Sequence, residues 1–256
     1  MVRILTYLGF GFFCLLLLLP VEVQADDQKD WDRFRFEVEA GPVWQNKNDV
    51  RIPGNSGTKF SFKDLTGSGP YASGRFTFDW NIRKKHGLRF LVAPLQIEGT
   101  GTFDQPVDFA GATFAPGVST KGKYKFNTYR ITYRYLLLNK NALRLRVGGT
   151  LLVRDAEIEL EQSGVKSSDS NVGVAPLLYV SGEWDFAQRW TAILDFDGLA
   201  GGPGRVLDLA LKVRYDLTDR WSVGAGYRML EGGADTDDVY NFSWFNYALL
   251  TVGYRF

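Results

Sequence analysis

The stretch YALLTVGYRF, residues 247–256, ends the chain and repeats its chemistry at every second residue. Counting back from Phe256, apolar side chains recur at Tyr254, Val252 and Leu250, and the alternate positions are mostly small or polar. Successive side chains of a β-strand point to opposite faces, so the stretch predicts a strand with one apolar face. Most chain ends fray into polar tails. This one stops on a large apolar ring.

The same period of two recurs along the chain. Residues 33–44 (RFRFEVEAGPVW) place aromatic and aliphatic side chains on one face and Arg and Glu on the other, and residues 71–82 repeat the pattern. No segment after residue 25 shows a sustained helical period. Breaks in the alternation near Pro94 and Asp155 predict β-bulges. The alternating segments predict ten strands, near 33–44, 71–82, 88–98, 124–138, 143–158, 172–186, 190–199, 205–217, 221–231 and 242–256.

The connections between these strands alternate in length. Tight connections fall at 83–87, 139–142, 187–189 and 218–220, and most of the others are long, such as 45–70 and 99–123. In an up-and-down meander, alternate connections lie at the same end, so long and short loops separate. The pattern predicts an all-β, antiparallel up-and-down arrangement of about ten strands, with eight or twelve as alternatives. We expect residues 58–64 to extend the first hairpin.

Residues 1–25 have the form of a secretory signal peptide. Arg3 supplies a basic start, an apolar run follows, and Val23, Gln24 and Ala25 resemble a cleavage site. A membrane-spanning helix is the alternative, but an apolar core of about 15 residues is shorter than the ~20 needed to cross a bilayer. We therefore expect one mature domain, residues 26–256. The formal net charge of the whole chain is only +1, which gives no reason to expect a nucleic-acid partner.

Tryptophan side chains lie near the ends of the expected strands rather than in their middles. Indole rings favour positions where one edge is apolar and the other wet, as at the two interfaces of a membrane barrel. In a soluble core, the largest rings would more often lie in mid-strand. The expected girdle comprises Trp44, Trp80, Trp184, Trp190, Trp221 and Trp244.

Charged side chains occupy the opposite face of the strands. A solvated surface could carry them, and a soluble barrel or sandwich would show the same alternation. However, the strand positions set Arg144 and Arg146 near Glu183 and Asp185, and Asp195 near Lys212. Opposite charges facing one another favour a narrow lumen, where unpaired ions would be costly. The expected lumen charges are Glu37, Glu39, Arg130, Arg134, Arg144, Arg146, Glu183, Asp185, Asp195, Asp197, Lys212 and Arg214.

The final strand resembles the C-terminal assembly signal of Gram-negative outer-membrane β-barrel proteins. In that family the last residue is aromatic, with Tyr or another apolar residue two positions before it. The resemblance implies a small single-chain closed transmembrane β-barrel, recognised by the barrel-assembly machinery and inserted among outer-membrane lipid and lipopolysaccharide, with both termini periplasmic. It indicates no particular subfamily. A closed barrel is also expected because every backbone N–H and C=O group in the hydrocarbon layer must be paired, and an open sheet edge would leave some of them unpaired.

Three functions remain open from the sequence. Omptin proteases and lipid A deacylases, both outer-membrane barrels, rely on a histidine, but the one histidine here, His86, falls in a tight turn at the expected periplasmic end. Asp195 and Asp197 could form an acid/base pair or bind a cation, but balancing Lys212 is the favoured interpretation. We therefore expect that the protein is not an enzyme and that it binds no cofactor or metal ion. We expect a monomeric structural or interaction barrel whose extracellular loops meet a partner that the sequence does not identify. A narrow porin-like channel for small solutes is the alternative, and an outer-membrane hydrolase comes third.

Overall fold

The structure is a computed structural model that describes residues 32–256 except 141 and 203. The expected signal peptide, 1–25, lies outside the described residues.

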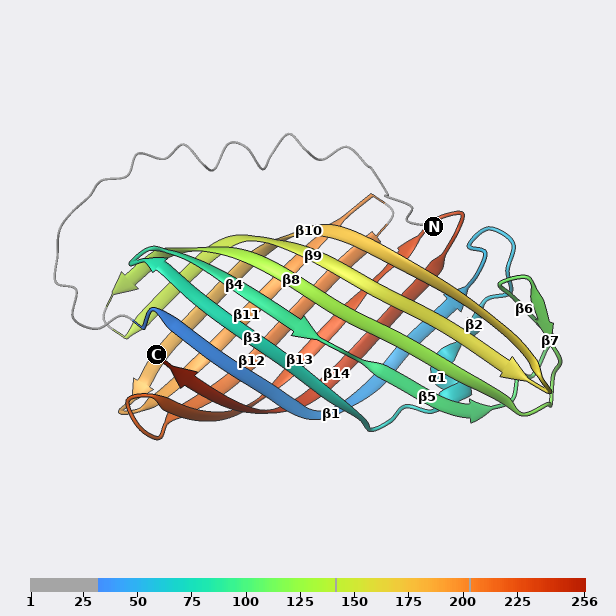
Figure 1. Cartoon of the computed structure of the whole chain (residues 1–256), viewed down its shortest axis with the longest axis horizontal. Helices are drawn as coiled ribbons and strands as arrows, with labels where there is room; N and C mark the ends of the chain where they lie inside the picture. Colours follow the sequence, from blue (N-terminus) through green and yellow to red (C-terminus); the bar gives the residue numbers. More distant parts are fainter. Residues whose placement is uncertain (1–31, 141, 203) are drawn as a thin grey trace.

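One antiparallel sheet closes on itself to form the barrel in Figure 1. Its strands are β1 (Phe34–Arg51), β3 (Tyr71–Arg83), β4 (His86–Ala93), β5 (Gln96–Gly101), β8 (Thr120–Lys140), β9 (Leu143–Gln162), β10 (Val165–Ala187), β11 (Trp190–Gly201), β12 (Gly204–Asp216), β13 (Trp221–Asp235) and β14 (Tyr240–Arg255). β4 and β5 lie in line against β8, so the wall has ten strands. The predicted meander of about ten strands is confirmed.

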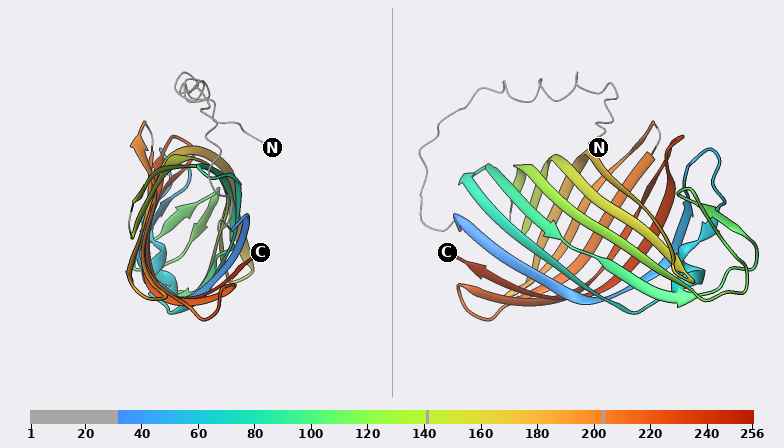
Figure 2. Two further views of the ribbon diagram at one scale, coloured as in Figure 1. Left: turned by 90° about the vertical axis from the view of Figure 1, so that its left-hand side faces the viewer. Right: turned by 45° about the vertical axis from the view of Figure 1, so that its right-hand side comes forward.

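Pairing of the first and last strands closes the wall. Phe36 of β1 lies opposite Tyr254, and Ala40 lies opposite Leu250. The backbone N–H of Phe256 donates to the carbonyl of Phe34 at 3.0 Å. The last residues are therefore held in the ladder, and the two ends of the described chain lie together at the tight-turn end. Seen along its length, the barrel has an oval cross-section (Figure 2).

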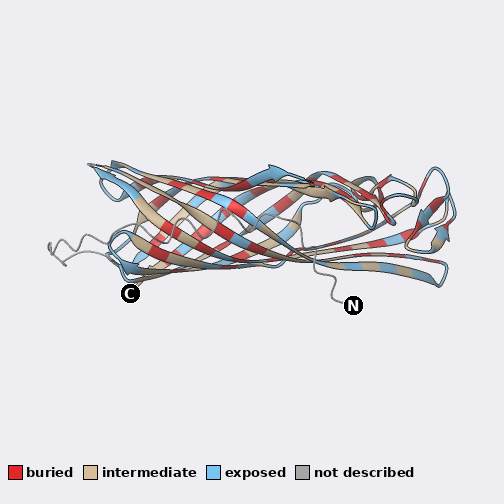
Figure 3. Cartoon of the chain, turned by 90° about the horizontal axis from the view of Figure 1, so that it is seen from above, coloured by how far each residue is buried: buried red, intermediate tan, exposed pale blue. Residues whose placement is uncertain are grey.

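The two faces of the wall differ in chemistry over its middle part. On β14 the side chain of Leu250 is 70% exposed, whereas Thr251, which points inward, is 7% exposed. Figure 3 shows buried and exposed positions alternating along the strands. Outward aromatic side chains bound this apolar surface at Trp244 and Tyr254. The ten residue steps from Trp244 to Tyr254, on a strand tilted as in membrane barrels, span about 25 Å, the height of an apolar membrane band.

The two breaks in the apolar–polar alternation, near Pro94 and Asp155, have different origins. Pro94 interrupts the wall strand between Ala93 and Gln96, but the register against β8 is the same on both sides of it, so the bulge expected there was wrong. The bulge expected near Asp155 was wrong, because β9 pairs with β8 and β10 through that residue without a register shift. What changes there is the chemistry of the two faces. Beyond Asp155 the inward positions become apolar and the outward ones acidic, since the strand enters water.

The loop end of the barrel is filled by its own connections. Residues 58–64 were expected to extend the first hairpin, but only β2 (Phe60–Ser61) pairs with β1, and the chain then forms the short helix α1 (Phe62–Thr66). The Ser61 hydroxyl accepts from the Asp64 N–H at 3.2 Å and so caps the helix. β6 (Val107–Phe109) and β7 (Ala112–Phe114) form a separate hairpin. Among the described residues, no helix is long and apolar enough to cross a membrane.

Candidate functional site

Asp208 lies at the centre of the lumen. Its carboxylate accepts hydrogen bonds from Arg228 at 2.6 Å and from Arg75 at 3.1 Å, and Arg130 lies 2.8 Å away. These residues come from four strands, β12, β13, β3 and β8, which the closed wall brings around one point. The Asp208 side chain is 1% exposed. Three guanidinium groups therefore share one buried carboxylate, and the site needs further negative charge.

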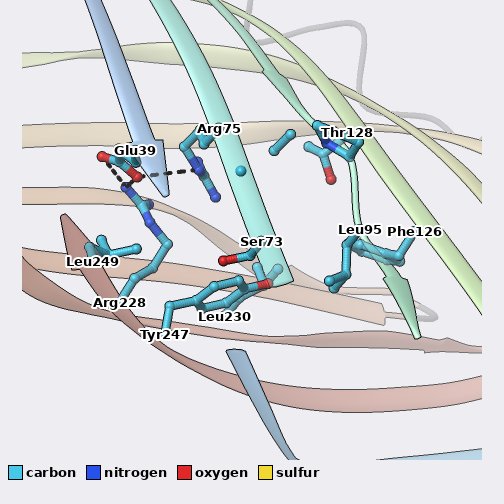
Figure 4. Close-up of a pocket in the computed structure, with 13 residues that line it drawn as sticks. Glu39, Ser73, Arg75, Leu95, Phe126, Thr128, Arg228, Leu230, Tyr247 and Leu249 are labelled. Atoms are coloured by element: carbon cyan, nitrogen blue, oxygen red, sulfur yellow. Dashed lines mark hydrogen bonds and ion pairs between the residues drawn. The ribbon is translucent and has the colours of Figure 1, made fainter. Parts of the chain in front are cut away.

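Glu39 of β1 supplies part of that charge. It accepts from Arg228 at 3.0 Å and from Lys212 at 2.7 Å, and the Arg75 Nε lies 3.6 Å away. Figure 4 shows the Glu39 carboxylate directed at Arg75 and Arg228. Lys212 also donates to Glu37 at 2.5 Å. Side chains from β1, β3, β12 and β13 are thereby tied together across the lumen.

A second group of pairs lies beside the first. Arg89 of β4 donates to Asp79 at 2.8 Å and to Asp195 on β11 at 2.6 Å. Arg130 donates to Asp197 at 2.9 Å. Asp79 also pairs with Arg134 at 3.0 Å. We call the two groups together the lumen network; its cations are Arg35, which donates to Glu37 at 2.7 Å, Arg75, Arg89, Arg130, Arg134, Lys212 and Arg228, and its anions are Glu37, Glu39, Asp79, Asp195, Asp197 and Asp208. Seven positive charges thus meet six negative ones.

A smaller network lies near the tight turns. Arg144 donates to Asp185 at 2.6 Å, and Arg146 donates to Glu183 at 2.6 Å. The Arg214 guanidinium lies 3.6 Å from the Glu183 carboxylate. The structure therefore brings Arg144 and Arg146 to the two carboxylates that the sequence set near them.

Asp195 lies near Lys212 as expected, since both line one cavity, but the ion pair of Asp195 is with Arg89. Asp195 lies opposite Ala210 in the β11–β12 register and pairs with Arg89, while Lys212 pairs with Glu37 and Glu39. The reason is geometric. Long side chains in a narrow oval lumen reach strands on the facing wall, and the sequence order of neighbouring strands does not record those distances.

The lumen network contains residues that sequence reasoning did not select, above all Arg75, Asp79, Asp208 and Arg228. Asp208 and Arg75 each stand on the polar face of an alternating segment, which was a usable signal. Arg228 follows a run of small residues in VGAGYRM, 223–229, where alternation is weak. One partner, Asp208, lies on the neighbouring strand β12, but the other, Glu39, lies on β1, remote in sequence, so only the closed barrel reveals that contact.

Two small cavities lie in the lumen. One encloses about 30 Å³ among lumen-network residues, including Glu37, Arg89 and Asp195. The other encloses about 20 Å³ and is lined by Glu39, Arg75, Tyr247 and Leu95 (Figure 4). Such volumes hold one or two water molecules. The second cavity marks the level at which the charged lumen meets an apolar layer.

That apolar layer, which we call the apolar plug, fills the loop end of the barrel. The Phe62 ring of α1 lies 5.7 Å from the Tyr124 ring, which lies 6.1 Å from the Phe245 ring. Gly122 makes room for α1, because a Cβ there would lie 2.9–3.0 Å from Phe62 and Leu65. The plug comprises Phe62, Leu65, Ile97, Phe109, Phe114, Tyr124, Ile158, Leu160 and Phe245, all buried.

The tryptophans fall into two groups along the barrel axis. Trp80, Trp184, Trp190 and Trp221 lie at the tight-turn end, where the Trp221 ring is 4.8 Å from that of Tyr254. The Tyr254 ring is in turn 4.8 Å from that of Phe256. At the loop end, Trp244 is 39% exposed, and Trp44 occupies an outward position on β1. This is the arrangement of two interfacial belts.

His86, which the sequence placed in a tight turn, lies directly after that turn in the structure. It is the first residue of β4, and its Nδ1 lies 2.6 Å from the Tyr133 hydroxyl. It occupies the outer face beside the ring of Tyr135. Asp195 and Asp197, the other candidates for chemistry, are both held in ion pairs with arginines. Among the described residues, no cluster of His, Cys, Asp or Glu could hold a metal ion.

These features define an outer-membrane β-barrel protein: a closed antiparallel wall, an apolar outer band and two aromatic belts. No protein-family model and no curated protein matches the sequence. The attachment invasion locus protein of Yersinia pestis is similar in structure, with 12% identity over 88% of this chain and 99% of that one, at a TM-score of 0.39. The outer membrane protease of Escherichia coli shows 10% identity over 87% and 96%, at a TM-score of 0.49. Neisserial surface protein A shows 16% identity over 87% and 97%, at a TM-score of 0.36.

Proposed function

We propose that this protein is a non-conducting outer-membrane barrel with a structural or interaction role carried by its extracellular part, and that both termini are periplasmic. The observation that supports the proposal is double closure of the lumen. The lumen network crosses the membrane part of the barrel, and the apolar plug fills the part beyond it.

The lumen network is unsuited to conduction for two reasons. Ions move through a pore when binding sites are weak enough to release them, whereas Asp208 and Glu39 are each held by several buried cations. A ten-stranded barrel is close to the size that its own side chains fill.

The extracellular part is built as a water-soluble structure. Its outward positions on β8 carry Lys121, Lys123 and Lys125, which face Glu161, Glu159 and Glu157 on β9. Its inward positions form the apolar plug. A barrel that only needed closing could end in short hairpins, so this folded extension supports a role in contacting an extracellular partner. The engaged carboxylates Asp195 and Asp197 support the absence of a hydrolytic site.

Planar-bilayer recording of the purified, folded barrel tests the proposal. We expect no stable single-channel steps under conditions in which a porin, added to the same bilayer, gives its usual steps. Stable steps that disappear in Arg130→Ala or Asp195→Ala would contradict the plugged lumen and favour the channel.

A further inference from the structure

The extracellular end of β10 has a free edge. On one side β10 pairs with β9 along its whole length from Val165, but on the other side it meets β11 only from Leu178 onward. Residues 165–177 therefore have one paired and one unpaired side. The β11–β12 hairpin that would cover this edge ends at Gly201 and Gly204.

The hairpin between β9 and β10 fixes which backbone groups face the open side. Its two-residue turn, Ser163–Gly164, has positive φ at both positions, 50° and 82°, so Gln162 and Val165 form a hydrogen-bonded pair. In an antiparallel ladder, bonded and non-bonded pairs alternate. The N–H groups of Lys166, Ser168, Ser170 and Val172 therefore point away from β9.

Pro176 has the same parity as those four residues. It has no N–H, and it lies four residues further into the barrel than Val172, which is opposite Asp155, so its level is apolar and an unpaired donor there would be costly. Above it, no proline interrupts 166–172. The inner side of this segment is supported, since the Ser167 hydroxyl donates to the Ala110 carbonyl of the β6–β7 hairpin at 2.8 Å. The edge is thus a regular row of donors and acceptors in water.

We propose that this edge, residues 166–172 of β10, binds an extended peptide segment of an extracellular partner as an added β-strand. The inference rests on the proposed interaction role and names its site. An unpaired edge is a template for strand addition, in which backbone hydrogen bonds give affinity and alternate side chains give specificity.

A second copy of this chain does not fit the edge. Two barrels in one membrane share the same normal, and their strands tilt by about 35–45° from it. If two barrels faced each other through this edge, a half-turn about the membrane normal would relate them, and their β10 strands would tilt in opposite directions. The two strands would then cross at about 70–90°, and at that angle no hydrogen-bonded ladder can form. A peptide segment free to turn has no such restriction.

Charge at the edge indicates which segment fits. Asp169 points toward the inner side, where burial and the nearby Asp238 carboxylate of the β13–β14 loop raise its pKa. A lysine or arginine on the inner face of the added strand would stabilise the charged form of the Asp169 carboxylate. Val172, 51% exposed on the outer face, favours an apolar residue opposite it.

Titration of the full mature barrel in detergent micelles with a fluorescent peptide tests the inference. The peptide has ten residues, alternating Thr and Val with one central Lys, and binding is followed by anisotropy. We expect saturable binding that weakens about tenfold in Ser170→Pro, which removes one outward N–H and leaves the β9 ladder intact, and that is unchanged in Ser170→Ala. Heat-modifiable migration reports that each variant is folded.

A second arm needs no protein variant. The same peptide, N-methylated at the backbone nitrogens of its pairing edge, should not bind, and the unmodified peptide should slow hydrogen exchange at Ser168, Ser170 and Val172. Equal binding of the methylated peptide, unchanged affinity in Ser170→Pro, or no binding of the unmodified peptide would overturn the inference. Channel steps in the bilayer experiment would instead overturn the proposed function, so the two failures are distinguishable.

Discussion

Replacing Asp208 with asparagine tests the lumen network at its centre. Asparagine keeps the shape and one acceptor oxygen but removes the negative charge. Arg75, Arg130 and Arg228 then share only Glu39 and Asp197. We expect the free energy of unfolding to fall by about 3–5 kcal/mol, the range for breaking a buried ion pair and leaving its partner uncompensated.

The magnitude follows from burial. The side chains of Asp208 and Arg130 are each 1% exposed and 2.8 Å apart, so water and salt screen their attraction little. Asp49 provides the matched control. Its carboxylate lies 3.3 Å from Lys47 and 3.5 Å from Lys59, but both lysine side chains are about half exposed. Asp49→Asn should therefore cost about 1 kcal/mol or less.

Equilibrium urea unfolding in lipid vesicles, followed by tryptophan fluorescence, measures both variants. Added salt should reduce the small effect of Asp49→Asn and leave that of Asp208→Asn nearly unchanged. If Asp208→Asn also costs only about 1 kcal/mol, or if salt removes its effect, water reaches the centre of the lumen. The reasoning from a dry, charge-paired interior would then be refuted.

One deletion and two substitutions test other parts of the molecule. Deleting Phe256 removes its ring contact with Tyr254 and its backbone bond to Phe34; we expect reduced outer-membrane yield of folded barrel, measured by heat-modifiable migration, and a normal yield would count against an assembly role. Leu250→Arg places a charge on the lipid face and should lower stability in vesicles by about 2–4 kcal/mol, whereas a change near zero would show that this face meets water. Phe62→Ala opens the apolar plug and should cost about 3–5 kcal/mol in urea unfolding, and a cost under 1 kcal/mol would mean that the plug is loosely packed.

The sequence predicted the wall of the barrel well because the wall depends on local rules. A period of two specifies a strand, and loop lengths specify the direction of the meander. The pairs of Arg144 and Arg146 with Glu183 and Asp185 follow from the same rules, since β9 and β10 are neighbours in sequence and in space.

The cross-lumen contacts depend on properties that no single segment contains. Arg89 reaches Asp195, and Lys212 reaches Glu37, because the oval section brings facing walls within the length of one side chain. The apolar–polar alternation also could not predict the fold of residues 58–66. Phe60 and Phe62 alternate like strand residues, but α1 forms where Ser61 can cap it and where Gly122 leaves room.

The change of chemistry at Asp155 carries the most information about function. On β9 the parity of the strand stays constant, but leucine and valine point outward before Asp155, and Glu157, Glu159 and Glu161 point outward after it. On β8 the facing positions, Lys121 to Lys125, are basic. A bulge would have shifted the register, whereas a change of solvent reverses the chemistry of both faces and leaves the register alone. The reversal therefore locates the water–lipid boundary on the wall. It also shows that the strands continue into water as a folded structure, and that is the part of the molecule on which the free edge of β10 lies.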